Sequence, residues 1–194
     1  MYGQPEIIRP DFMKKGDSEF IDKVVNGFGD RKKASTLWWQ QGDKFANEGN
    51  LDYAMRRYNQ SWLLNPENYQ PYWGFGRVML QQQKYNESIK YFEKAKSLID
   101  DDYQKVALLS DFGSALSYAA INSTEVNKKN ELYRKAESNF LESTNLDKEY
   151  GKAWLQWAYS LYQQEKYNES KEKLIKAKSL GESYPKLEEL LKSK

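Results

Sequence analysis

The sequence predicts an all-α fold, a right-handed α-solenoid of four helix pairs, and three observations lead to this prediction. The phrase Lys-Tyr-Asn-Glu-Ser occurs at 84–88 and again at 166–170, and Ala-Lys-Ser-Leu follows each copy. Small and large residues recur with a period of 34. Aromatic residues make up 15% of the 194-residue chain, although only 39% of it is hydrophobic. A period of this length indicates stacked helix hairpins, and the aromatic content indicates a folded chain.

Four repeats divide residues 34–182, at 35–68, 69–102, 106–150 and 151–182. Three positions of each repeat, the 8th, 20th and 27th, are always small. They are Gly42, Gly76, Gly113 and Ala158, then Ala54, Ser88, Ala136 and Ser170, then Ser61, Ala95, Ser143 and Ala177. The 24th position is always large (Tyr58, Phe92, Phe140, Leu174). Two antiparallel helices approach closely where small residues meet, so we expect each large side chain to fill the space beside a small one.

The third repeat is longer than the others, because the two copies of the phrase lie 82 residues apart and 82 is not a multiple of 34. The separation exceeds two periods by 14 residues (82 − 68). Three of these precede the third repeat, and eleven lie within it, in the polar stretch 121–131. Eleven residues amount to about three helical turns. The insertion therefore either lengthens both helices of the pair or forms a projecting loop, and it is a candidate interaction surface.

Both ends are expected to cover the repeats. Residues 1–33 are predicted to form an extended arm, rich in proline and glycine up to Gly16, and then a short helix from Asp17 to Asn26 that Gly27 and Gly29 break. Residues 183–194 are predicted to form a C-terminal capping helix, with leucines on one side and charges on the other.

This pattern of small and large positions resembles the tetratricopeptide repeat (TPR), over residues 35–182. The resemblance implies a concave groove lined by the first helix of each repeat, which binds a protein or peptide. The side chains that it places in this groove are Trp39, Gln40, Asp43, Asn47, Gln70, Trp73, Arg77, Gln81, Asp111, Tyr118, Lys152, Gln156, Tyr159, Tyr162 and Gln163.

Trp39 and Trp73 occupy the same position of successive repeats. Tryptophan is typical of binding hot spots, but these rings are also suited to covering the N-terminal arm or the adjacent helix, and both interpretations stay open. Chaperone-binding members of the family hold a terminal carboxylate with a lysine and an asparagine where this chain has Trp39 and Asp43. A partner recognised through an acidic C-terminus is therefore not expected.

Composition argues against catalysis, metals and nucleic acid. The chain has no cysteine and no histidine, which removes thiolate nucleophiles, imidazole bases and the usual zinc ligands. We expect no catalytic residues, no metal and no cofactor. The acidic run Asp100–Asp102 is interpreted as a helix cap. A net charge of +2 gives no electrostatic reason to expect a nucleic-acid partner.

The function predicted from the sequence is non-catalytic: a protein- or peptide-binding adaptor or assembly scaffold. The alternatives are a self-assembling structural scaffold of the bacterial envelope and, last, a small-ligand-binding or hydrolytic protein. The opening Met-Tyr-Gly-Gln-Pro-Glu and the run 56–76 resemble small bacterial envelope lipoproteins that carry these repeats. This likeness implies a lipid anchor on a cysteine that the sequence lacks, and it favours a periplasmic or outer-envelope location over the cytoplasm. Homo-oligomers are compatible with all of these interpretations.

Overall fold

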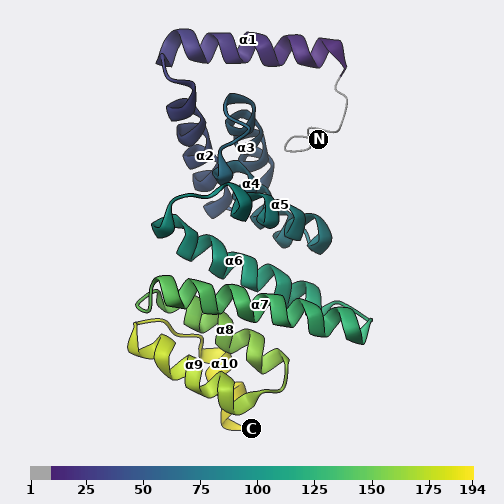
Figure 1. Cartoon of the computed structure of the whole chain (residues 1–194), viewed down its shortest axis with the longest axis vertical. Coiled ribbons are helices and arrows are strands. Elements are labelled where there is room, and N and C mark those ends of the chain that lie inside the picture. The colour runs from purple at the N-terminus through teal and green to yellow at the C-terminus, as the bar shows by residue number, and fades with distance from the viewer. Residues whose placement is uncertain (1–9) are drawn as a thin grey trace. The chain divides into compact units, whose positions relative to one another are not determined.

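The computed structural model describes residues 10–194, and every regular element in this range is an α-helix (Figure 1). The helices are α1 (Asp11–Phe28), α2 (Arg31–Asn47), α3 (Leu51–Leu64), α4 (Tyr69–Gln81), α5 (Tyr85–Leu98), α6 (Asp102–Ile121), α7 (Val126–Leu146), α8 (Gly151–Gln163), α9 (Tyr167–Ser179) and α10 (Pro185–Lys192). The chain forms two compact parts. The N-terminal module ends at Ile99 and holds α1–α5, and the C-terminal module begins at Asp100 and holds α6–α10.

Consecutive helices form the four pairs α2/α3, α4/α5, α6/α7 and α8/α9. In the N-terminal module α4 packs against both α2 and α3, and in the C-terminal module α8 packs against both α6 and α7. Within each module the first helices of the two pairs are therefore neighbours, and we call α2, α4, α6 and α8 the inner helices. The predicted fold class, an all-α array of helix pairs with a terminal capping helix, is confirmed.

Close contacts between small and large residues join each pair, as predicted. A Cβ atom added to Gly76 would lie 2.8 Å from the Phe92 ring, and one added to Gly113 would lie 2.7 Å from the Phe140 ring. Both rings are fully buried. The glycines are thus required by the approach of the paired helix, because any side chain there would displace a ring.

The serines of the repeated phrase have a second role that the pattern of small residues did not predict. Ser88 Oγ donates a hydrogen bond of 2.8 Å to the carbonyl of Gly76, and Ser170 Oγ donates one of 2.7 Å to the carbonyl of Ala158. Both serines are completely buried. A buried hydroxyl needs such a partner, so serine at this position adds a polar link to the small-residue contact.

The insertion of the third repeat lengthens helices. Helix α6 has 20 residues and α7 has 21, whereas α4, α5, α8 and α9 have 13 or 14. The predicted acidic cap is present at the start of α6, where Asp101 Oδ1 accepts hydrogen bonds from the backbone of Tyr103 and Gln104. Of the two possibilities for the insertion, the structure has the longer helices.

The N-terminal region differs from the expected arm and short helix. Helix α1 begins after Pro10 and runs through Gly16 and Gly27, so residues 11–16 are helical; residues 1–9 of the expected arm lie outside the described residues. Proline suits the start of a helix because the first N–H groups of a helix have no partner within it. A residue without an N–H therefore loses no hydrogen bond there. The helix ends where Gly29, at φ 70°, donates its N–H to Val25.

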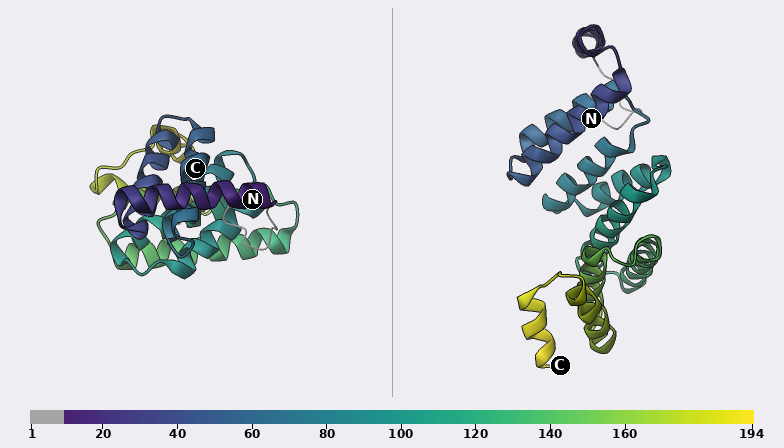
Figure 2. Two further views of the ribbon diagram at one scale, coloured as in Figure 1. Left: turned by 90° about the horizontal axis from the view of Figure 1, so that it is seen from above. Right: turned by 90° about the vertical axis from the view of Figure 1, so that its left-hand side faces the viewer.

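Helix α1 crosses the α2/α3 pair (Figures 1 and 2). The rings of Phe20 and Phe28 meet the Trp38 ring edge-on at 5.9 and 5.7 Å, and Val24 is buried beneath them. At the other end, Leu187 and Leu191 of α10 are buried against α8 and α9.

Candidate functional site

In the N-terminal module, two indole rings stack across the inner helices. The centroids of Trp39 on α2 and Trp73 on α4 lie 6.3 Å apart with an interplanar angle of 24°. Trp39 is half-buried, whereas only 7% of Trp73 is exposed. Of the two interpretations left open for these tryptophans, packing against the adjacent helix describes Trp73, whose ring is almost fully covered. Trp39 remains the indole that a partner can reach.

One turn further along both helices, an ion pair repeats this cross-helix arrangement. Arg77 Nη1 lies 2.5 Å from Asp43 Oδ1, and the two side chains are 28% and 26% exposed. Arg77 Nη2 also approaches Asn47 Oδ1 at 3.5 Å. The same Asp43 oxygen has a second contact, a 3.3 Å hydrogen bond that the Tyr58 hydroxyl donates. These contacts fix the ion pair in one geometry on the surface of the inner helices.

Tyr58 reaches this surface from the core. Its ring lies against Gly42 and Gly74, where an added Cβ would meet ring carbons at 2.6 Å. Burial raises the pKa of Tyr58 well above its usual range, and the nearby Asp43 carboxylate raises it further. The hydroxyl therefore stays protonated and serves as a hydrogen-bond donor.

The remaining predicted residues of this module are amides. Gln40 and Gln81 are exposed on α2 and α4, and Gln70 is half-buried at the start of α4, where its Oε1 accepts a 3.3 Å hydrogen bond from Asn68. We name the surface made by Trp39, Gln40, Asp43, Asn47, Gln70, Trp73, Arg77 and Gln81 the α2/α4 face.

The corresponding α6/α8 face belongs to the C-terminal module. It holds the predicted residues Asp111, Tyr118, Lys152, Gln156, Tyr159, Tyr162 and Gln163. Lys152 Nζ lies 3.0 Å from Asp111 Oδ1, and the Asp111 side chain is only 12% exposed. Beside this pair, Ser110 donates a hydrogen bond to the side-chain oxygen of Gln156.

Tyrosine rings continue the α6/α8 face. The Tyr118 and Tyr159 centroids are 6.2 Å apart, and Tyr184, the residue before α10, meets Tyr159 at 6.0 Å. Burial raises the pKa of Tyr159, and the neighbouring tyrosines raise it further, while Gln163 opposes the shift by hydrogen bonding. Tyr162 contacts Tyr167 instead, at 5.7 Å, so it lies toward α9.

Sequence reasoning missed two residues of these faces. Tyr58 is at a core position of the repeat. The one signal was Gly74, a glycine that the repeat pattern does not require and that makes room for the Tyr58 ring. Tyr184 lies outside the repeats, in the turn before the capping helix, and its aromatic character was the only signal.

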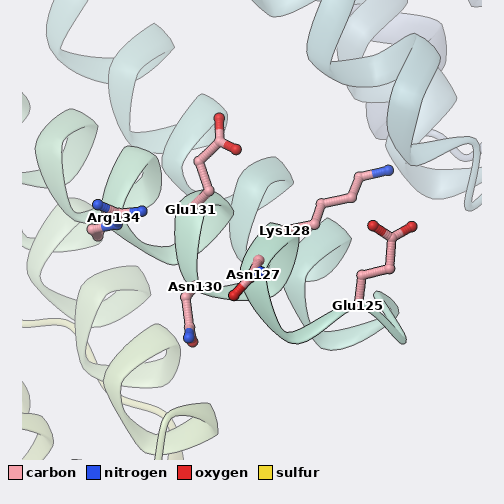
Figure 3. A pocket seen from close by; sticks show the side chains of 6 residues that line it. All are labelled: Glu125, Asn127, Lys128, Asn130, Glu131 and Arg134. Carbon is pink, nitrogen blue, oxygen red and sulfur yellow. The ribbon is translucent and has the colours of Figure 1, made fainter.

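The insertion forms no enclosed site. Glu125, Asn127, Lys128, Asn130, Glu131 and Arg134 line an open hollow along the start of α7 (Figure 3). Five of these side chains come from α7, and Glu125 immediately precedes it. Glu131 pairs with Lys135 of the next turn at 2.7 Å, which lowers the pKa of Glu131. This stretch is a solvated surface with charges of both signs.

The described part of the chain offers neither a metal site nor a membrane span. Within residues 10–194, no group of three or more acidic side chains comes together to hold a metal ion. No helix in this range combines the length and apolar character needed to cross a bilayer. Consecutive helix pairs, with small residues packed against large rings, define the class of fold, an all-α helical-repeat array of the TPR type.

Comparison with solved structures supports this class. The chain is similar to TTC0263, a thermophilic TPR protein of Thermus thermophilus, with a TM-score of 0.69 and 14% identity over 79% of this chain and 77% of that one. It is also similar to two structures of MamA. One has a TM-score of 0.58 and 12% identity over 90% of this chain and 96% of the other, and the second has 0.55 and 19% over 77% and 74%. Identities this low show the fold alone.

No family model matches the sequence, and no curated protein matches it.

Proposed function

We propose that this chain is a non-catalytic adaptor or assembly scaffold that binds an extended segment of another protein on its inner-helix faces. The observation that carries the proposal is the partly exposed Trp39 ring beside the fixed Asp43–Arg77 pair on the α2/α4 face. In the family that the repeats resemble, this is the surface that holds peptides. Tryptophan and arginine are the side chains that contribute most to protein-binding hot spots.

The contacts between neighbouring helices support this role. Trp39 rests on Trp73, and Arg77 is held by Asp43, so neither side chain has to be immobilised when a partner arrives. Ordering a flexible side chain on binding costs about 0.5–1.5 kcal/mol, and a surface arranged in advance avoids this loss. The exposed amides Gln40 and Gln81 supply donors and acceptors for a partner's backbone.

The experiment is partner capture with the variant Trp39→Ala. The full chain is immobilised and exposed to an extract of its native cell, bound proteins are identified by mass spectrometry, and the affinity of the purified partner is measured by calorimetry. We expect Trp39→Ala to weaken binding by about tenfold or more. The variant also loses the ring that stacks on Trp73, so its affinity is measured at a temperature at which circular dichroism shows it to be folded. Tyr53→Ala is the matched control, because Tyr53 is 49% exposed but lies on α3.

Two outcomes contradict the proposal: equal binding by the Trp39→Ala variant and the parent chain, or equal loss in both variants. The variant Trp73→Ala is unsuitable for this test, because removing a buried indole is expected to cost about 3–5 kcal/mol of stability.

An envelope location is part of this proposal and has its own test. It is supported by the likeness of the sequence around 56–76 to envelope lipoproteins that carry these repeats. Mass spectrometry of the mature protein from its native cell should find a lipid-modified cysteine ahead of Met1. An unmodified N-terminus on the mature protein would remove the lipoprotein part and leave the adaptor function standing.

A further inference from the structure

We propose that Tyr118, Tyr159 and Tyr184, together the tyrosine strip, dock an uncharged, proline-rich segment of a partner protein. The inference rests on the proposed function only in that the inner helices bind a protein segment. It goes further by stating the chemistry of the partner segment and by placing its binding site in the C-terminal module. One residue of that site, Tyr184, lies outside the repeats.

Three different elements contribute one ring each to the strip. Tyr118 lies near the end of α6, Tyr159 is on α8 and Tyr184 immediately precedes α10. Adjacent centroids are 6.2 and 6.0 Å apart, and the outer rings are 40% and 38% exposed. Tyr159 between them is half-buried and packs against the buried leucines of α10. The strip is thus a supported row of rings with accessible ends.

The charges of this face select against an ionic partner. Asp111 and Lys152, its ion pair, neutralise each other at 3.0 Å. The Asp111 side chain is mostly buried and Lys152 is 47% exposed, and the pair as a whole carries no net charge. A segment rich in acidic or basic residues would lose hydration here without finding a complementary charge, whereas an uncharged segment loses only the hydration of its backbone groups.

The rings and amides match a proline-rich backbone. A polyproline II helix has no internal hydrogen bonds, so its carbonyls need external donors, and proline-rich segments bind surfaces lined with aromatic rings. A tyrosine hydroxyl can donate such a hydrogen bond. Gln156 supplies another, because its side-chain oxygen already accepts from Ser110 and its NH₂ group is the part left to donate.

The stiffness of this kind of segment also favours it. A polyproline II helix is largely formed before binding, so docking costs less conformational entropy than docking of a flexible chain. An amphipathic helix satisfies its own backbone and would not use the donors of this face. The chemistry therefore favours an extended, proline-rich occupant over a helical one.

The test uses fluorescein-labelled decaproline and the full-length chain, with binding measured by fluorescence polarisation. A Gly-Ser peptide and an amphipathic helical peptide of the same length are the comparison probes. We expect decaproline to bind most tightly, with an affinity that changes little with salt. Tyr118→Ala should weaken this binding by about tenfold, and Tyr184→Ala should weaken it similarly.

Tyr103→Ala is the matched control, because Tyr103 lies on the same helix as Tyr118 and is 81% exposed, but is not part of the strip. Equal binding of decaproline and the Gly-Ser peptide would overturn the inference. So would preferred binding of the helical peptide, equal losses in the Tyr103 and Tyr118 variants, or light scattering showing that Tyr118→Ala dissociates a dimer of this chain.

The variant Trp39→Ala separates this inference from the proposed function. It is expected to lose the partner captured through the α2/α4 face and to bind decaproline normally. If Trp39→Ala loses the captured partner but the parent chain does not bind decaproline, only the present inference fails. If decaproline binds through the strip but Trp39→Ala has no effect on partner capture, the inference stands and the α2/α4 proposal fails.

Discussion

The hydroxyl of Tyr58 donates a 3.3 Å hydrogen bond to Asp43 Oδ1, although the Tyr58 residue has no exposed surface. The same carboxylate oxygen receives Arg77 Nη1. One aromatic side chain therefore joins the packed interior of the N-terminal module to the ion pair on the α2/α4 face. A change in the core at this point is expected to alter both stability and binding.

Replacing Tyr58 with phenylalanine tests this connection. The ring remains, but Asp43 loses one of its hydrogen-bond donors, so Tyr58→Phe should lower the free energy of unfolding by about 1 kcal/mol. Urea unfolding measures this change, and affinity for the partner captured through Trp39 should fall as well, because the Asp43–Arg77 pair is less fixed. Tyr53→Phe on the exposed side of α3 is the control, and equal behaviour of the two variants would disprove the connection.

Adding a methyl group at Gly74 should overpack the Tyr58 slot. The new Cβ would lie 2.6 Å from Tyr58 Cζ, so Gly74→Ala is expected to cost about 1–3 kcal/mol even though alanine favours a helix. At Gly27, also inside a helix, nothing lies within 4 Å, and Gly27→Ala should gain about 0.5–1 kcal/mol. Thermal unfolding of both variants should give shifts of opposite sign, and a stabilised Gly74→Ala would contradict the packing account.

Glycine at position 83 should stabilise the chain. Gln83 adopts φ 60° between α4 and α5, and the N–H of the next residue, Lys84, bonds back to Met79, as in a Schellman motif. Gly49 occupies the equivalent place after α2. A left-handed conformation costs a non-glycine residue about 1–2 kcal/mol, so Gln83→Gly should recover part of this energy.

The neighbouring residue provides the control for this prediction. Gln82 has φ −81°, where glycine brings no relief and only adds flexibility to the unfolded chain. Gln82→Gly should therefore destabilise the chain slightly in the same urea titration. If both variants shift the unfolding midpoint in the same direction, backbone strain at Gln83 is not the cause.

The raised tyrosine pKa values predict a loss of stability at alkaline pH. Burial raises the pKa of Tyr58, Tyr133 and Tyr159 above the unfolded value of about 10. The folded chain therefore holds these protons more tightly. This contribution is fully present below about pH 10 and declines as pH rises above it, because the unfolded chain releases the protons first.

Urea midpoints measured from about pH 8 to about pH 11 follow this decline. Tyr58→Phe removes one of the three groups, so its midpoint should fall less steeply than that of the parent chain. Parallel curves for the two proteins would show that Tyr58 ionisation does not contribute.

The repeat pattern predicted the helix pairs because close helix packing permits few residue types. Gly76 and Gly113 face Phe92 and Phe140 across their pairs, and this relationship is visible in the sequence as a fixed spacing. The insertion was located in the same way, although spacing alone could not decide between longer helices and a loop. That choice depends on whether the lengthened helices continue to pack against each other.

The faces were less predictable than the core. Position within a repeat placed Trp39 and Trp73 on adjacent helices, but which indole stays accessible depends on how the two rings stack. The start of α1 was missed because Gly16 suggested an arm, while the chain tolerates a glycine on an exposed part of the helix. Tyr184 joined the strip through the turn before α10, which no repeat position describes.

The matching serine contacts give the second helices of two pairs the same polar link to their first helices. Ser88 bonds to the carbonyl of Gly76 and Ser170 to that of Ala158, from identical five-residue phrases 82 positions apart. A recombination event within these phrases would join α4 directly to α9 and place Ser170 opposite Gly76. The same exchange in reverse would add the intervening helices a second time. Such an exchange would change the array by two hairpins at once and keep the serine hydrogen bond at the new junction, but it would set Leu174 against Gly76, where Phe92 packs now.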